Sequence, residues 1–268
     1  MLVDQLIDSG RYDLGDASLA EECHRTFVAD GVCVLPDFLT DRAVDTLRAE
    51  CDELASVAHR SSTAASPYLA PIDETFPIGH PRRTVSASSV EVVAYDQFPS
   101  HSPLRRLYES DSLLEFVRRC LGLHELHRYA DPFGALNLAI MRDGDRLGWH
   151  FDMTDFVVSI AIQSSDRGGD FENAKQIRSH AAECYDDVAA VLDGERPDRV
   201  RTEPMTPGTL MLFNGRWSMH RVTTILGSTP RYVALLAYDT KPGTDSSDTL
   251  KLSRYGRLPG ITTKVENR

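Results

Sequence analysis

Apolar residues recur at helical spacing in the first part of the chain. Residues 18–30 (SLAEECHRTFVAD) have a helical pattern that ends at Gly31, a residue that favours the position just after a helix. Thr40 can cap a second helix. Its apolar positions recur every three or four residues: Val44, Leu47, Cys51 and Leu54. Another amphipathic pattern spans roughly residues 112–122, and we expect the first two helices to pack on a sheet.

After Leu126 the pattern changes to short apolar or alternating runs separated by Gly, Asp and Pro. The runs are GALNLAIM, WHFDMTDFVVSIAIQ, GDFEN, TLMLFNG, HRVTTIL and RYVALLAYD, with one helical interruption near residues 181–192. Many short strands with turn residues between them are typical of a sandwich, a jelly roll or a barrel. The pattern therefore predicts a mainly β fold with packed helices, of the α+β class.

The length of the chain fits one domain over residues 1–268. This length, with 41% hydrophobic residues, is within the range of a single β barrel or sandwich with added helices. We expect a helical N-terminal part over about 1–122, a β core over about 123–240 and a C-terminal tail or lid over 241–268. Residues 59–71 (HRSSTAASPYLAP) are small, polar and contain proline, which predicts a mobile loop.

Charge and composition disfavour several classes of protein. The chain has 40 acidic and 29 basic residues, and a net charge of −11 argues against nucleic acid or an anionic membrane as a partner. No apolar run approaches the roughly 18 residues of a membrane span. The N-terminus lacks the order of a signal peptide, so we expect a cytoplasmic protein. The five cysteines are scattered and never form C-x-x-C, which favours reduced buried thiols over disulfides or a zinc–thiolate site.

An imidazole and a carboxylate stand two positions apart in GWHFDMTD, residues 148–155. On a strand, successive side chains point to opposite faces, so His150 and Asp152 would share one face and Phe151 would take the other. A ferrous ion that must also bind a chelating cosubstrate and oxygen is commonly held by two histidines and one carboxylate. This pair would supply two of the three ligands.

We predict that His220 is the third ligand. It is the one remaining histidine that lies in a downstream strand-like run, GRWSMHRVTTIL, bounded by turn residues. His24, by contrast, lies in a predicted helix. The sequence therefore predicts a metal site of His150, Asp152 and His220.

Arg231 stands eleven residues after His220. The GSTP segment between them predicts a hairpin with a loop over Gly227–Pro230, in which Leu226 pairs with Arg231. The arginine would then share the face of His220, roughly 20 Å away along the strand direction. An arginine side chain and an elongated dicarboxylate would fill this gap, since the planar guanidinium binds a carboxylate through two parallel hydrogen bonds.

Together these residues resemble the signature of the iron(II)- and 2-oxoglutarate-dependent oxygenases, whose fold is a double-stranded β-helix, also called a jelly roll and cupin-like. NLAIMRDGDRLGWHFD resembles the segment before the metal in this superfamily. DGVCVLPDFLTDRAVDTLR resembles the N-terminal segment of its phytanoyl-hydroxylase-like branch. WHFDMTDFVVSIAIQ, GGDFE and HRVTTILGSTPRY are similar to bacterial enzymes that hydroxylate or halogenate free amino acids and related metabolites. The resemblance covers residues 20–240 and implies Fe(II), 2-oxoglutarate and O2 as cofactor and cosubstrates.

The resemblance also implies roles for single residues. His150, Asp152 and His220 would form the catalytic iron site, and Arg231 would hold the distal carboxylate of 2-oxoglutarate. Asn137 matches an asparagine that hydrogen-bonds the cosubstrate in some members, although it can instead satisfy a local backbone group. Halogenating members carry a small residue where this chain has Asp152, which frees a position for halide. The carboxylate therefore favours hydroxylation, with release of succinate and CO2.

The expected substrate is a small metabolite, most simply a free L-amino acid or a derivative from specialised metabolism. In the similar amino-acid-modifying enzymes, an arginine in the region of Arg82 and Arg83 receives the substrate carboxylate, and Arg83 is our candidate. Solvated surface arginines are the alternative. The C-terminal segment DTLKLSRYGR can fold back as a lid that supplies Tyr255, or it can pack on the outside. Residues 59–75 can close over the substrate and exclude water.

Two other functions stay open. The jelly roll can bind a small acid or another metal without oxidising anything. The predicted ligands can also hold zinc and activate water for hydrolysis, although hydrolysis has no need of the dicarboxylate clamp that Arg231 would provide.

Overall fold

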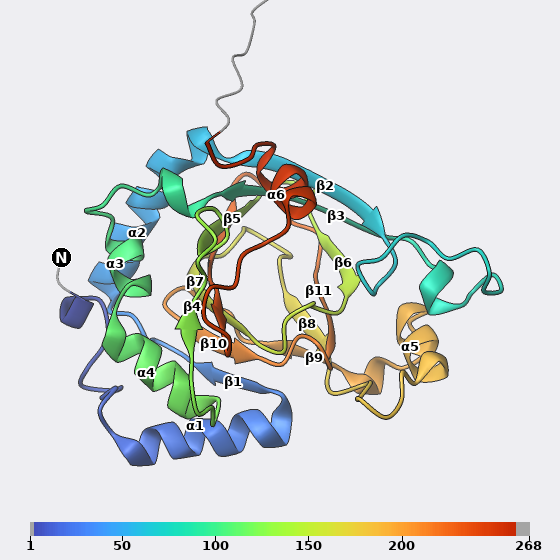
Figure 1. The fold of residues 1–268 in the computed structure, drawn as a ribbon, viewed down its shortest axis with the longest axis horizontal. Helices are drawn as coiled ribbons and strands as arrows, with labels where there is room; N and C mark the ends of the chain where they lie inside the picture. The colour runs from blue at the N-terminus through green and yellow to red at the C-terminus, as the bar shows by residue number, and fades with distance from the viewer. Residues whose placement is uncertain (1–2, 261–268) are drawn as a thin grey trace, which may run out of the picture.

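Two antiparallel β-sheets face each other in the computed structural model, which describes residues 3–260 (Figure 1). The larger sheet has the strand order β1-β10-β7-β12-β5-β3-β2, the smaller one β6-β11-β8-β9, and β13 pairs with β4 separately. The strands are β1 (Val32–Leu35), β2 (His59–Ala65), β3 (Ser86–Val93), β4 (His127–Arg128), β5 (Leu136–Met141), β6 (Leu147–His150), β7 (Val157–Gln163), β8 (Phe171–Ala174), β9 (Val200–Glu203), β10 (Leu210–Phe213), β11 (Met219–Val222), β12 (Arg231–Leu236) and β13 (Tyr238–Asp239). The predicted α+β class and jelly-roll core are confirmed.

Four helices, α1 to α4, cover the outer face of the larger sheet (Figure 1). The α-helices are α1 (Ala17–Asp30), α2 (Asp41–Leu54), α3 (Pro103–Tyr108), α4 (Asp111–Cys120), α5 (Tyr185–Leu192) and α6 (Asp248–Tyr255). As predicted, α1 ends at Gly31, which has a left-handed φ of 69°, and Thr40 caps α2 by accepting a hydrogen bond from the Ala43 amide. In the part of the chain that the structure describes, no helix is long and apolar enough to cross a membrane.

Alternation along the central strands separates an outer from an inner face of the larger sheet. On β5, Leu136, Leu138 and Ile140 join the core beneath the helices. The intervening side chains of β5 point toward the smaller sheet. On β12, Tyr232 and Ala234 belong to the same outer core, so Arg231 faces inward with the β5 residue that pairs with it, Met141.

The N-terminal part of the chain is less helical than expected. It contributes β1 to one edge of the larger sheet and the β2–β3 ribbon to the other. Residues 59–65, which we predicted to lie in a loop, form β2, whose seven residues all pair with β3. That prediction was wrong because the partner strand supplies the hydrogen bonds that favour an extended chain here, although the side chains are small and polar.

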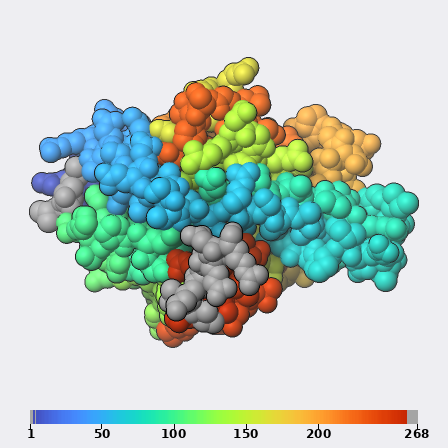
Figure 2. Space-filling model, turned by 90° about the horizontal axis from the view of Figure 1, so that it is seen from above, coloured from blue at the N-terminus to red at the C-terminus, as the bar shows by residue number. Residues whose placement is uncertain are grey.

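Residues 66–85, between β2 and β3, pack against α5. The Tyr185 ring lies 4.5 Å from His80 and 6.1 Å from Tyr68 between centroids, and its hydroxyl accepts a hydrogen bond from Arg82. Figure 2 shows the cyan segment that follows β2 projecting from the body of the molecule below the orange of α5. This segment is therefore held by an aromatic cluster.

Candidate metal and cosubstrate site

His150, Asp152 and His220 converge at one point of the smaller sheet. The Nε2 atom of His220 lies 3.3 Å from Oδ2 of Asp152, and Nε2 of His150 lies 3.8 Å from Oδ1. One ligand atom from each of the three residues lies within 4.8 Å of the others. The side chains of His150 and Asp152 are 15% and 20% exposed, against 7% for His220, so solvent reaches the first two more than His220. This spacing suits a single metal ion with free coordination positions.

Backbone carbonyls fix the orientation of both imidazoles. Nδ1 of His150 lies 2.8 Å from the carbonyl oxygen of Gly148, and Nδ1 of His220 lies 3.0 Å from that of Ser218. Each Nδ1 therefore carries the proton of the neutral ring, which leaves the lone pair of Nε2 to face the metal.

Electrostatics favour the ligand forms of His150 and Asp152. Burial, and then His220, lowers the pKa of His150 to about 4, so the ring is neutral at pH 7. Burial by itself would raise the pKa of Asp152, but the two histidines and Arg254 outweigh it, so that this pKa is lowered. Burial favours neutral His220, yet Asp152 outweighs burial and raises the pKa of His220. A bound cation would replace that proton beside the carboxylate.

Asp152 does not lie on a strand, contrary to our expectation. β6 ends at His150, and the extended path continues through a hydrogen bond from the Asp152 amide to the carbonyl of Gly215. Gly215 also makes room for the carboxylate, since a Cβ atom there would lie 1.8 Å from Oδ2 of Asp152. Gly215 is not among the residues predicted from the sequence, where its only signal is a glycine that directly follows the β10 segment and Asn214.

His220 lies between aromatic rings of both sheets. Its ring centroid is 5.5 Å from that of Phe171 on β8 and 4.7 Å from that of Phe213 on β10. Since Phe213 belongs to the larger sheet, these contacts show that His220 faces the space between the sheets. The metal triad therefore opens onto the interior of the jelly roll.

Arg231 lies on the opposite sheet and has no counter-ion in the part of the chain that the structure describes. It is 7% exposed, and within residues 3–260 its guanidinium makes neither a hydrogen bond nor an ion pair shorter than 4.0 Å. Burial lowers its pKa to about 10, with Asp170 acting weakly in the other direction. Gly169 leaves room for the Arg231 side chain, because a Cβ atom at residue 169 would lie 3.0 Å from Cδ of Arg231. A buried cation without a partner is costly, and a carboxylate ligand would neutralise it.

The predicted hairpin between His220 and Arg231 is wrong. β11 pairs with β6 and β8 in the smaller sheet, whereas β12 pairs with β5 and β7 in the larger one. Leu226 pairs with Arg167 instead of Arg231. Where the chain crosses between the sheets, Asp166 accepts hydrogen bonds from the amides of Ser228 and Thr229 and holds this segment in place. His220 and Arg231 still face the same space, but they do so from opposite sheets.

Asn137 and Tyr255 bind each other. Asn137, on the inner face of β5, donates hydrogen bonds to the carbonyls of Phe133 and Leu136 and accepts one of 2.8 Å from the Tyr255 hydroxyl. The expected contacts of Asn137 with cosubstrate and of Tyr255 with substrate stay predictions, although α6 does fold back onto the β-sheet.

Arg82 and Arg83, which lie in the segment before β3, both have partners in the protein. Arg83 donates to the carbonyl of Phe76, and Arg82 donates to the hydroxyl of Tyr185 and lies 3.9 Å from Glu183. The role of Arg83 in binding substrate stays a prediction.

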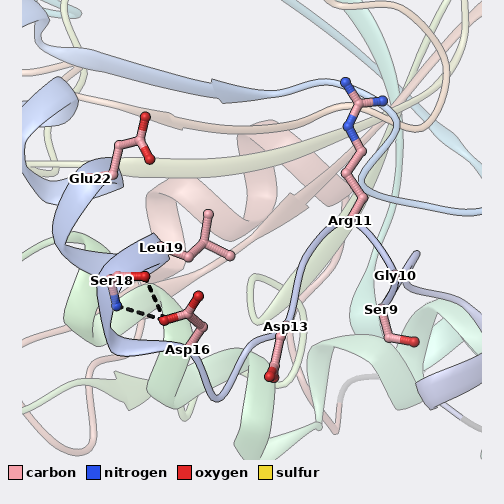
Figure 3. A pocket seen from close by; sticks show the side chains of 8 residues that line it. All are labelled: Ser9, Gly10, Arg11, Asp13, Asp16, Ser18, Leu19 and Glu22. Carbon is pink, nitrogen blue, oxygen red and sulfur yellow. Dashed lines mark hydrogen bonds between the residues drawn. The ribbon is translucent and has the colours of Figure 1, made fainter.

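A surface depression of about 300 Å³ lies elsewhere, at the N-terminus (Figure 3). Its walls come from residues 9–22 alone and include Asp13, Asp16 and Glu22, while Asp16 caps α1. None of the predicted site residues lines it.

The family model described as HalD, Halogenase D, matches residues 15–253 of this sequence. The chain belongs to the halogenase D family. The match confirms the resemblance to enzymes that hydroxylate or halogenate, and it leaves open which of the two reactions a family member with Asp152 carries out. No curated protein matches the sequence significantly.

Solved structures with the same fold include enzymes described as α-ketoglutarate-dependent and a prolyl hydroxylase. The epimerase SnoN, solved with Fe3+, α-ketoglutarate and nogalamycin RO, has 14% identity and a TM-score of 0.59, with 92% of this chain and 93% of that chain covered. The carbocyclase SnoK from nogalamycin biosynthesis has 16% identity and a TM-score of 0.57, with 90% and 96% covered. A prolyl-4-hydroxylase from Pseudomonas putida has 13% identity and a TM-score of 0.51, with 81% and 97% covered. At these identities the likeness establishes the fold of this halogenase D family member.

Proposed function

We propose that this protein is an iron(II)- and 2-oxoglutarate-dependent oxygenase that hydroxylates a C–H bond of a small metabolite, most simply a free L-amino acid. One observation carries the proposal. His150, Asp152 and His220 converge on the smaller sheet, and the larger sheet opposite them holds Arg231, which is buried and has no partner among residues 3–260. When bound, iron and 2-oxoglutarate supply an oxidant derived from O2 and leave succinate and CO2.

The residues of the chain fit these two groups. His150 and His220 offer Nε2 lone pairs and Asp152 offers a carboxylate oxygen, which is the donor set of ferrous oxygenases. Arg231 offers a guanidinium fork for the distal carboxylate of 2-oxoglutarate. The buried rings of Phe171 and Phe213 exclude water behind His220. A zinc hydrolase would leave the charge of Arg231 unexplained, as would a metal site that binds no acid.

Halogenation is the second candidate because of the family to which the chain belongs. A halide would need the position that a protein carboxylate fills. Asp152 lies beside both imidazoles, and the bare Cα of Gly215 accommodates its carboxylate. This arrangement favours the oxygen-inserting reaction over halide transfer.

The test uses protein loaded with Fe(II) without oxygen, then given 2-oxoglutarate, O2, chloride and a panel of free L-amino acids. We expect succinate and a product heavier by one oxygen atom. A product in which chlorine replaces hydrogen would overturn hydroxylation. If no member of the panel promotes succinate formation or is modified, the amino acid would be wrong as the substrate class.

A further inference from the structure

The inward face of α6 carries three polar side chains, of which two have partners. Lys251, Arg254 and Tyr255 stand three and four positions apart and so share one face of the helix. Lys251 pairs with Asp245 at 2.6 Å, and Tyr255 binds Asn137 at 2.8 Å. The Nε atom of Arg254 is buried and has no hydrogen-bond partner, and within residues 3–260 its guanidinium makes no ion pair.

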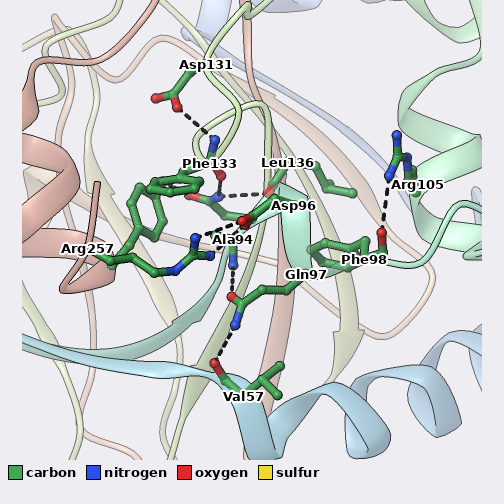
Figure 4. Close-up of polar contacts among 12 residues, drawn as sticks. Val57, Ala94, Asp96, Gln97, Phe98, Arg105, Asp131, Phe133, Leu136 and Arg257 are labelled. Atoms are coloured by element: carbon green, nitrogen blue, oxygen red, sulfur yellow. Dashed lines mark hydrogen bonds and ion pairs between the residues drawn. The ribbon is translucent and has the colours of Figure 1, made fainter. Parts of the chain in front are cut away.

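Several contacts fix α6 against the larger sheet. The Ser61 hydroxyl on β2 donates to the carbonyl of Ser253 at 3.0 Å. Directly after the helix, Arg257 binds Asp96 through two hydrogen bonds of 2.6 and 2.7 Å, and its guanidinium lies 4.0 Å from the centroid of the Phe133 ring (Figure 4). Arg254 is therefore held on an anchored helix, unlike an arginine on a free tail.

This face of α6 lies on the side of the larger sheet that faces the metal triad. The helix contacts β2 and β3, and β3 contacts β6, which ends at His150. The Gly148 amide on β6 donates to the hydroxyl of Ser88 on β3 at 3.0 Å. Tyr255, the residue after Arg254, donates a hydrogen bond to Asn137 on the inner face of β5, which borders the same space as the triad. Arg254 is therefore carried by a helix that reaches the space between the sheets, onto which the triad opens.

We propose that Arg254 binds a carboxylate of the substrate beside the metal triad. The proposal rests on the proposed function, and it narrows the substrate to small acids whose carboxylate ends near the metal. A guanidinium with unused donors gains the most from a carboxylate, because the pair forms charge-assisted hydrogen bonds and neutralises a partly buried cation.

Other arginines near the open side of the site already have partners. Arg178 pairs with Glu183 at 3.1 Å, Arg216 pairs with Asp155 at 2.5 Å, and Arg83 donates to a backbone carbonyl. The cosubstrate is the other source of a carboxylate, but Arg231 on the opposite sheet is already available for it. Arg254 is left for the substrate.

The test measures binding by anaerobic calorimetry of the Fe(II)-loaded protein, first with 2-oxoglutarate and then with free L-amino acids and their α-carboxamides. In the natural protein we expect at least one free acid to bind and its carboxamide to bind roughly tenfold or more weakly. Arg254→Met should weaken binding of the acid by a similar factor and leave the affinity for 2-oxoglutarate unchanged. Arg231→Met should do the reverse, and Arg42→Met, on the exposed surface of α2, should change neither.

Each other outcome has a definite meaning. The inference is overturned if Arg254→Met binds the acid as well as the natural protein does, if acid and carboxamide bind equally, or if no free acid in the panel binds. It is also overturned if Arg83→Met, rather than Arg254→Met, removes binding, or if 2-oxoglutarate loses affinity in Arg254→Met. Failure of the natural protein to bind 2-oxoglutarate with iron would instead refute the proposed function.

Discussion

The carboxylate of Asp152 fits at the metal site because residue 215 has no side chain. A Cβ atom at this position would lie 1.8 Å from one carboxylate oxygen and 2.6 Å from its carbon. No positive φ is involved, so the requirement is steric. The glycine therefore controls where the Asp152 carboxylate lies, although it cannot bind a metal itself.

Gly215→Ala should displace the Asp152 carboxylate and weaken Fe(II) binding by roughly tenfold or more, since misplacement of a ligand or its support typically costs this much. Anaerobic metal titration measures the change. Gly10→Ala is the matched control, because a Cβ atom there would lie 3.4 Å from its nearest neighbour. Equal iron affinity in both variants would refute the steric role.

Asp152→Ala should abolish hydroxylation, because one of the three protein ligands is lost while both imidazoles keep their backbone hydrogen bonds. Succinate formation and product mass measure the effect, with chloride present. Undiminished hydroxylation in this variant would exclude the carboxylate as a ligand.

Arg231→Ala should weaken binding of 2-oxoglutarate by about 2–4 kcal/mol, because the buried charged contact is lost. The affinity for Fe(II) should change little, since Arg231 lies on the other sheet. Calorimetry with each ligand in turn separates the two effects, and a loss of iron affinity alone would contradict the assignment.

The three residues that the structure brings together at the candidate metal site could be picked out from the sequence because their chemistry is distinctive. Imidazole, carboxylate and guanidinium groups are rarely buried without a partner. An H-x-D segment and a histidine in a predicted strand therefore indicate a functional site. Gly215 could not be predicted, because its role depends on the approach of a loop from another segment. The same is true of Arg254, whose place depends on where α6 docks.

At the scale of elements, the site depends on which sheet each strand joins. β11 brings His220 to the smaller sheet and β12 brings Arg231 to the larger one, with Gly227–Pro230 crossing between them. The eleven residues from His220 to Arg231 thus lead the chain from the smaller sheet to the larger one. Ligands that touch both residues must lie between the sheets.

The C-terminal helix is coupled to β5 through Tyr255 and Asn137. Tyr255→Phe should destabilise the protein by about 1–2 kcal/mol, because a buried amide oxygen loses its donor. In a double-mutant cycle with Asn137→Ala, the two losses should be less than additive. Urea denaturation gives the free energies of unfolding, and full additivity would show that the two side chains do not interact energetically.

Helices were easier to predict than edge strands. The ends of α1 and α2 follow from local caps, Gly31 and Thr40, which act within a few residues. β2 carries serine, threonine and alanine, and its extended form depends on pairing with β3. The hairpin expected after His220 failed for a similar reason, because turn residues do not specify which strand becomes the partner.

At the scale of the whole molecule, a ligand that binds between the two facing sheets should also raise the free energy of unfolding. The triad belongs to the smaller sheet and Arg231 to the larger one, so iron with 2-oxoglutarate would connect them. The free energy of such binding adds to the free energy of unfolding. Jelly-roll topology, which the alternating runs indicated, creates this arrangement.

Fe(II) with 2-oxoglutarate at about a hundred times its dissociation constant should stabilise the protein by about 2.7 kcal/mol beyond iron alone. For a chain of this size we expect Tm to rise by roughly 5–10 °C. Differential scanning calorimetry without oxygen measures it. Arg231→Met should keep the shift caused by iron and lose the shift caused by 2-oxoglutarate, and an equal response of both proteins would contradict a link between the sheets.

The most direct measurement is an anaerobic titration of the Fe(II)-loaded protein with 2-oxoglutarate. Binding is monitored by the visible charge-transfer absorption that arises when 2-oxoglutarate chelates Fe(II). Our account predicts that one equivalent binds, only when iron is present, and that His220→Ala and Arg231→Met each weaken this binding strongly. Binding that is equally tight without iron, or that survives both substitutions, would contradict a shared site for iron and 2-oxoglutarate.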